Sequence, residues 1–132
     1  MTKVIVITGA TGVLGNLTAK TFAAQGHALA LLDHDQHKLD ILTRDLNLPS
    51  ERLFASVVDL RNGKAVQASA EAVAQKFGSV HAVCHLVGGW LGSRTLTEST
   101  EEDLTSMLGQ HVWTTFNLFQ AFSPKLASNN WG

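Results

Sequence analysis

The chain has 132 residues, of which 45% are hydrophobic and 16% charged, and its formal net charge is −1. This length suits one domain, so residues 1–132 are expected to form a single domain. The small net charge excludes a basic surface for nucleic acid or an anionic membrane. One cysteine excludes a disulfide within the chain and favours a reducing compartment, so we expect a cytoplasmic location.

The first predicted element is a buried strand that ends in a glycine-rich turn. Lys3 to Ile7 contains four consecutive β-branched residues, and a helix is predicted from Val13 to Gln25. Glycines in the turn allow a sharp bend and a close approach to a diphosphate, which the free N–H groups of the helix would face. The alternative is a turn that binds no ligand. The segment assigned to dinucleotide contact comprises Thr8, Gly9, Thr11, Gly12, Val13, Leu14 and Gly15.

The second predicted strand, from His27 to Leu32, ends at an acidic residue. Asp33 follows the last glycine of the turn at nearly the spacing of about 20 residues expected for an acid that hydrogen-bonds an adenosine ribose. A carboxylate accepts hydroxyl hydrogen bonds but repels the 2′-phosphate of NADP, so NAD is favoured over NADP. The alternative for Asp33 is the N-cap of the next helix.

Two more units of strand and helix follow. Asp35 can cap the second helix, and the third strand, Leu53 to Val58, closes at Asp59. Asn62 can cap a third helix, from Gly63 to Phe77. Asp59 is interpreted either as a ligand contact or as a further helix cap.

The fourth predicted strand, Val80 to Val87, is nearly all apolar and is followed by Gly88. Ser99 and Glu102 fit a capping box for one long helix that reaches about Leu126. This alternation predicts an α/β fold: a Rossmann-like, doubly wound parallel sheet of strand order 3-2-1-4. Ligands of such sheets bind beyond the carboxyl ends of the strands, where this chain places Thr8, Gly9, Asp33, Asp59, Val87 and Gly88.

These segments resemble the short-chain dehydrogenase/reductase family over essentially the whole chain. The matching pieces are TGATGVLG (Thr8 to Gly15), Asp33, VVDLRN with Asp59 and Leu60, HLVGG (His85 to Gly89) and FNLFQAFSPKL (Phe116 to Leu126). The resemblance implies that Asp33 contacts the adenosine ribose and that Asp59 and Leu60 flank the adenine. It also implies that Val87 and Gly88 lie against the ribose and nicotinamide. The implied reaction is hydride transfer between a nicotinamide dinucleotide and a small alcohol or ketone.

Three features depart from the family pattern. His111 stands where the family usually has an asparagine that supports a proton relay; a catalytic role is the hypothesis, and a packed or surface histidine is the alternative. The usual NNAG reads HLVG here. The chain contains no tyrosine and lacks the family's serine, tyrosine and lysine segment, so these 132 residues alone are expected to be inactive. The alternative function is a catalytically silent dinucleotide sensor or assembly module.

Two further expectations concern metals and partners. His34 and His37 lie beside Asp33 and Asp35, but a solvated helix start explains them, so no metal is expected. The predicted strand Val80 to Val87 has the composition of a central strand, yet without a fifth strand it would form a sheet edge. We therefore expect a homo-oligomer or completion by further chain at this edge.

Overall fold

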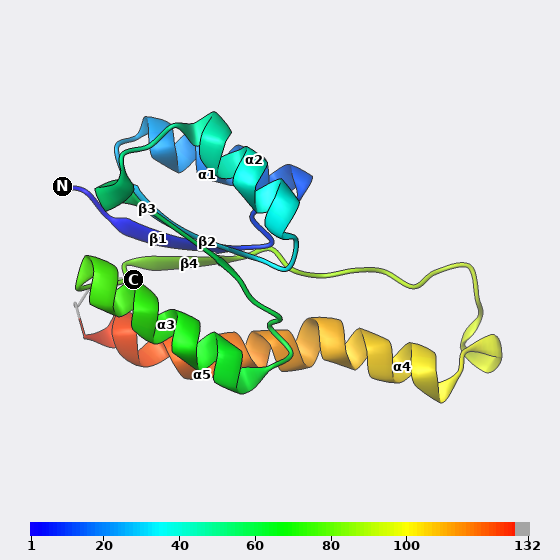
Figure 1. Cartoon of the computed structure of the whole chain (residues 1–132). Helices are drawn as coiled ribbons and strands as arrows, with labels where there is room; N and C mark the ends of the chain where they lie inside the picture. The colour runs from blue at the N-terminus through cyan, green and yellow to red at the C-terminus, as the bar shows by residue number, and fades with distance from the viewer. Residues whose placement is uncertain (129–132) are drawn as a thin grey trace.

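The computed structural model describes residues 1–128 and contains a parallel sheet of four strands (Figure 1). The strands are β1 (Val4–Thr8), β2 (Ala28–Asp33), β3 (Leu53–Val57) and β4 (Ala82–His85), in the order β3-β2-β1-β4. This confirms the predicted α/β class and strand order. Residues 129–132, where a fifth strand of the family pattern would begin, lie outside the described residues.

Helices cover both faces of the sheet. In Figure 1, α1 (Val13–Ala24) and α2 (Gln36–Leu46) lie on one face, and α3 (Gly63–Phe77) and α5 (Thr114–Ala127) lie on the other. Successive side chains of a strand point to opposite faces, so β1 serves two cores. Val4 and Val6 belong to the cluster with residues of α3 and α5, whereas Ile5 and Ile7 belong to the cluster with residues of α1 and α2. All five residues of β1 are buried.

The predicted caps of two helices are confirmed. The Asp35 side chain accepts a hydrogen bond from the Lys38 N–H at the start of α2, and the Asn62 side chain accepts one from the Ala65 N–H at the start of α3. Each satisfies one of the backbone donors that a helix leaves unpaired in its first turn. The alternative of Asp33 or Asp59 as a helix cap is therefore wrong.

The predicted single long helix after β4 is wrong in two respects. Its capping box consists of Thr100 and Asp103, not Ser99 and Glu102. The helical stretch is also divided: α4 (Glu101–Leu108) is followed by a π-helical segment, η3 (Gly109–Trp113), before α5 begins. Two short 3-10 turns complete the assignment, η1 (Ser50–Arg52) and η2 (Leu96–Glu98). The loop that follows β4 extends away from the sheet, and so does α4 (Figure 1).

The fourth strand is shorter than predicted. It spans Ala82–His85 because it pairs with β1 from Ile5 to Thr8, and β1 then turns away at Gly9. All four residues of β4 are only partly buried, in contrast to those of β1 and β2. In the part of the chain that the structure describes, β4 forms one edge of the sheet, with no strand on its outer side.

Candidate cofactor-binding site

The turn between β1 and α1 is built by tight backbone contacts at two glycines. Gly9 has a φ of +64°, and a Cβ there would lie 2.8 Å from the Leu86 carbonyl oxygen. A Cβ on Gly15 would collide with the Gly9 carbonyl oxygen and lie 2.8 Å from the Cα of Ala10. Both positions therefore require glycine for the fold itself. Gly15 lets α1 lie against the turn.

Gly12 differs, because the protein leaves space around it. Its φ of −68° is open to any residue, and a Cβ there would have only the Gly9 carbonyl oxygen nearby, at 3.4 Å. Gly12 is also the N-cap of α1, and it offers no side chain to the N–H groups of the first turn. Val13 and Leu14 follow it with exposed fractions of 95% and 59%. The start of α1 thus presents backbone donors and two apolar side chains to the outside.

Asp33, the last residue of β2, connects this strand to the glycine-rich turn between β1 and α1. Its side chain is only 3% exposed. The Oδ2 atom accepts hydrogen bonds from the N–H and the hydroxyl of Thr11, both at 2.9 Å. The Oδ1 atom accepts from the His34 N–H at 2.8 Å and from the Asp35 N–H at 3.3 Å. The carboxylate therefore holds the glycine-rich turn in place beside the carboxyl end of β2.

Asp59 lies after β3 and is paired with Arg61. The guanidinium donates from Nε at 3.1 Å and from Nη2 at 3.2 Å to the two carboxylate oxygens, and the Arg61 N–H donates as well, at 2.9 Å. These hydrogen bonds hold the pKa of the Asp59 carboxyl below its usual range. More than half of each side chain is exposed, so the pair contributes little to stability.

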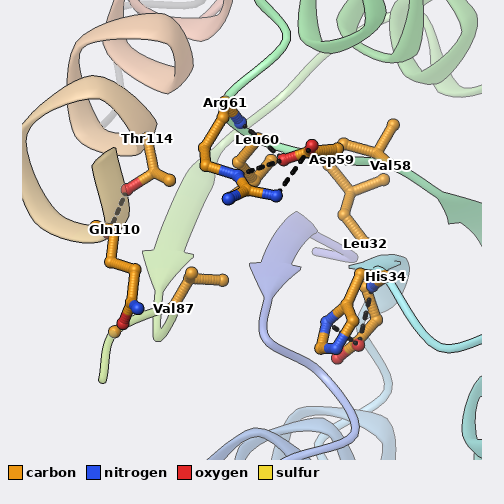
Figure 2. Close-up of a pocket in the computed structure, with 11 residues that line it drawn as sticks. Leu32, His34, Val58, Asp59, Leu60, Arg61, Val87, Gln110 and Thr114 are labelled. Atoms are coloured by element: carbon orange, nitrogen blue, oxygen red, sulfur yellow. Dashed lines mark hydrogen bonds and ion pairs between the residues drawn. The ribbon is translucent and has the colours of Figure 1, made fainter. Parts of the chain in front are cut away.

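A pocket of about 420 Å³ lies beyond the carboxyl ends of the strands. Figure 2 shows Arg61 folded back onto Asp59 at the centre of the view, while Gln110 and Thr114 come from the helix on the left. The walls combine apolar side chains with a few polar ones, as expected for a small-molecule site. They are formed by Leu32, Asp33, His34, Val58, Asp59, Leu60, Arg61, Val87, Gly88, Gln110 and Thr114.

His111 lies beside this pocket, in η3. Its Nε2 is 2.6 Å from the Gly89 carbonyl oxygen, and because a carbonyl only accepts, Nε2 carries the proton. In the neutral ring, Nδ1 is then an acceptor. The ring lies against Gly88, since a Cβ on Gly88 would be 3.0 Å from the His111 Cε1 and 3.4 Å from Nδ1. His111 therefore borders the wall that Gly88 forms.

The structure brings together five of the residues that the sequence nominated: Asp33, Asp59, Leu60, Val87 and Gly88 line one pocket. Thr11 contacts Asp33, whereas Val13 and Leu14 lie at the exposed start of α1, outside the pocket walls. Sequence reasoning missed Arg61, Gln110 and Thr114. The position of Arg61 two residues after Asp59 was an available signal; the other two needed the position of the helix.

A comparison with models of protein families identifies the family of this chain. The family model described as short chain dehydrogenase matches residues 3–132. The chain belongs to the short-chain dehydrogenase family. Relatives include an uncharacterized oxidoreductase of Staphylococcus epidermidis, 28% identical over 130 residues, which cover 98% of this chain and 55% of that protein. Another is estradiol 17-beta-dehydrogenase 11 of Macaca fascicularis, 29% identical, with 98% of this chain and 43% of the relative covered.

Solved structures of short-chain dehydrogenases have the same arrangement. A short-chain dehydrogenase/reductase from Burkholderia phymatum in complex with NAD is 31% identical, with a TM-score of 0.87 over 98% of this chain and 46% of that one. An NAD+-bound xylitol dehydrogenase is 26% identical, with a TM-score of 0.89 over 98% of this chain and 50% of that one. The chain spans about half the length of these relatives.

Residues 1–128 contain no group of three or more histidine, cysteine, aspartate or glutamate residues arranged to hold a metal ion, and His34 and His37 belong to no such group. None of the helices that the structure describes is long and apolar enough to cross a membrane.

Proposed function

We propose that this chain is the cofactor-binding part of an oxidoreductase that transfers hydride between NAD(H) and a small alcohol or carbonyl compound. The observation that carries the proposal is Gly12. The fold itself does not require glycine at this position, and the space in front of it is open at the start of a helix whose first-turn N–H groups lack a side-chain cap. A diphosphate needs both open space and backbone donors.

The neighbouring residues supply the other contacts of a dinucleotide. We assign the diphosphate to the turn from Thr8 to Gly15, the adenosine ribose to Asp33, the adenine to Asp59 and Leu60, and the inner ribose and nicotinamide to Val87 and Gly88. The family membership and the likeness to two NAD-bound structures support this assignment.

NAD is proposed over NADP on grounds of charge. Asp33 would repel a 2′-phosphate. Arg61, the cation in the pocket wall, has its guanidinium already engaged by Asp59 through two nitrogen atoms. Among the residues that line this pocket, a 2′-phosphate would therefore meet the Asp33 carboxylate, whose Oδ1 lies 3.2 Å from the His34 Nδ1, and an Arg61 guanidinium that Asp59 already engages.

Bound nicotinamide would supply the hydride chemistry, and the chain's own residues would position it. We propose His111 as a proton-handling residue at this end of the site, because its Nε2 donates to the Gly89 carbonyl oxygen and its Nδ1 lies next to Gly88. The chain contains no tyrosine, so the remaining catalytic groups would have to come from further sequence.

Titration of the chain with NADH and NADPH, followed by fluorescence, tests the proposal. We expect saturable binding of NADH, weaker binding of NADPH, and no reduction of NAD by alcohols with these 132 residues alone. No binding of either dinucleotide would refute the cofactor assignment. Saturable reduction of NAD by this chain would show that the catalytic group has been misplaced.

A second candidate function is a silent dinucleotide sensor or assembly module, which the absence of tyrosine favours. The coding sequence after Gly132 distinguishes the two. An open reading frame that carries tyrosine with lysine four residues later supports the oxidoreductase, and a stop codon supports the silent module.

We also propose that residues 1–132 form one dinucleotide-binding domain and that further sequence of the same protein covers the open edge of β4. The relatives are about twice as long as the matched region, which provides a source for such a segment. A second copy of this chain at the edge is the other outcome to be tested. The cytoplasmic location stays a prediction, to be tested by cell fractionation.

A further inference from the structure

One histidine links three elements at the carboxyl edge of the sheet. His85 is the last residue of β4, and its Nδ1 is 2.8 Å from the Thr8 hydroxyl at the end of β1. Its Nε2 is 3.1 Å from the Thr115 hydroxyl in α5. Thr8 immediately precedes the glycine-rich turn, and Thr115 lies one helical turn after His111. The imidazole thus spans the distance between the proposed diphosphate site and the segment that carries His111.

The donor and the acceptor of each of these hydrogen bonds can be assigned by starting from the Thr115 hydroxyl. The Thr115 hydroxyl is 2.6 Å from the His111 carbonyl oxygen, which can only accept. Thr115 therefore has no proton left for His85, so the Nε2 of His85 must be the protonated nitrogen that donates to Thr115. In the neutral ring Nδ1 then accepts from the Thr8 hydroxyl.

The hydrogen bonds of the Thr8 hydroxyl agree with this assignment of donors and acceptors. The Thr8 oxygen accepts a hydrogen bond from the Leu86 N–H at 3.2 Å while its proton is donated to His85. The chain of hydrogen bonds thus runs from the Leu86 N–H through Thr8, His85 and Thr115 to the His111 carbonyl. Each hydroxyl in it accepts one hydrogen bond and donates one.

We propose that neutral His85 is a positioning residue for dinucleotide binding, which holds the start of the phosphate-binding turn and the His111 segment in one fixed arrangement. The proposal rests on the proposed function. The connection between the turn and the His111 segment needs both hydrogen bonds of the ring, because Thr8 contacts one side of the imidazole and Thr115 the other.

Protonation of His85 would break the arrangement. A charged imidazole donates from both nitrogens, so the Thr8 hydroxyl would lose its acceptor. Burial and, to a smaller degree, the charge of His111 lower the pKa of His85. His111 is the titratable group that faces the ring from η3. The groove between β4 and α5, which His85 also lines, is formed by Val83, Leu118, Phe119, Phe122, Ser123 and Leu126.

Because the pKa of His85 is lowered, the pH dependence of dinucleotide affinity has a definite sign. A lowered pKa means that His85 stays neutral in the folded protein at and somewhat below the ordinary histidine value of about 6.5. The affinity for the dinucleotide should therefore be fully present above this value and should fall as the pH drops through the pKa of His85.

Calorimetric titration with NAD+, which tolerates acid, tests the proposal in the full chain. We expect the dissociation constant of the unchanged protein to rise as the pH is lowered from about 7.5 through the pKa of His85, by at least about fivefold once this histidine is protonated. His85→Phe keeps the ring volume but should bind about fivefold more weakly at the higher pH, with a much flatter profile. His37→Gln is the control: it removes an exposed histidine of α2 and should keep the original profile.

A second measurement is independent of ligand binding. Long-range proton–nitrogen NMR spectra should show His85 with its proton on Nε2, and Thr115→Val, a milder change than His85→Phe, should alter that signal. A proton on Nδ1, or the same pH profile with and without His85, would overturn the inference while leaving the proposed function standing. Failure of the unchanged protein to bind NAD+ at about pH 7.5 would instead refute the proposed function.

Discussion

The Asp33 carboxylate is already used by the protein itself before any ligand is considered. Its Oδ2 atom accepts two hydrogen bonds from Thr11, and Oδ1 accepts from two backbone N–H groups. A carboxylate has about four acceptor positions, so a ribose hydroxyl would have to share or replace one of these donors. The Thr11 hydroxyl is the donor that can rotate away. If the proposed ribose assignment holds, Asp33 would therefore act on a dinucleotide both directly and through the turn.

Two substitutions separate these effects. Asp33→Asn keeps the shape but removes the charge, and we expect NADH to bind about ten- to a hundredfold more weakly, with reduced discrimination against NADPH. Thr11→Val keeps the carboxylate, so discrimination should survive and affinity should change only a few-fold. Fluorescence titration with NADH and NADPH measures both affinities and their ratio. Asp45→Asn, on the exposed face of α2, is the control for the loss of a negative charge. Unchanged NADH affinity in Asp33→Asn would refute the ribose assignment.

In the turn between β1 and α1, the fold requires glycine at Gly9 and Gly15, whereas the proposed ligand requires it at Gly12. Gly15→Ala should destabilise the protein by about 1–3 kcal/mol, because its Cβ would collide with the backbone of Gly9 and Ala10. Gly12→Ala should leave the thermal midpoint almost unchanged but weaken NADH binding about tenfold or more, because the methyl group would occupy the space in front of the helix. Thermal unfolding and NADH titration of both variants provide the comparison. Gly12→Ala that binds NADH normally would contradict a diphosphate at this turn.

The sequence predicted those helix starts that depend on one local signal. Asp35 and Asn62 each precede a clear apolar pattern, and both cap as expected. The start of α4 was predicted in the wrong register because Ser99 with Glu102 and Thr100 with Asp103 both satisfy the capping-box pattern. In the structure the Ser99 hydroxyl donates to the Thr95 carbonyl oxygen, and it is the Thr100 hydroxyl that accepts from the Asp103 N–H at the start of α4.

Features that depend on tertiary structure could not be predicted from residue patterns. The π-helical segment η3 is a change in backbone hydrogen bonding within a continuous helical stretch, and the single glycine at its start, Gly109, does not by itself distinguish it from a straight helix. The pairing of Arg61 with Asp59 depends on side-chain conformation. The strand order and the convergence of Asp33, Asp59 and Gly88 on one pocket were predictable, because crossover connections in parallel sheets follow strict rules.

We expect the stability of this chain to depend on whether the open edge of β4 is covered. The described residues place no strand beside β4, and Val83 with Phe119, Phe122 and Leu126 of α5 lines an apolar groove of about 100 Å³ there. Covering a large apolar side chain contributes about 1.5–3 kcal/mol. Three such side chains left partly uncovered would therefore approach the roughly 5–15 kcal/mol stability of an entire domain.

We therefore expect the isolated 132-residue chain to self-associate or to unfold with low cooperativity, and a longer form of the protein that covers β4 to be more stable. Analytical ultracentrifugation and thermal unfolding of both forms measure the difference. Val83→Lys should reduce association of the isolated chain, because a charged side chain in the groove opposes pairing at an edge strand. Lys would disfavour a second copy and a covering segment alike, so the longer form should lose stability on the same substitution. A monodisperse monomer of 14.2 kDa with a cooperative thermal transition would show that β4 needs no cover.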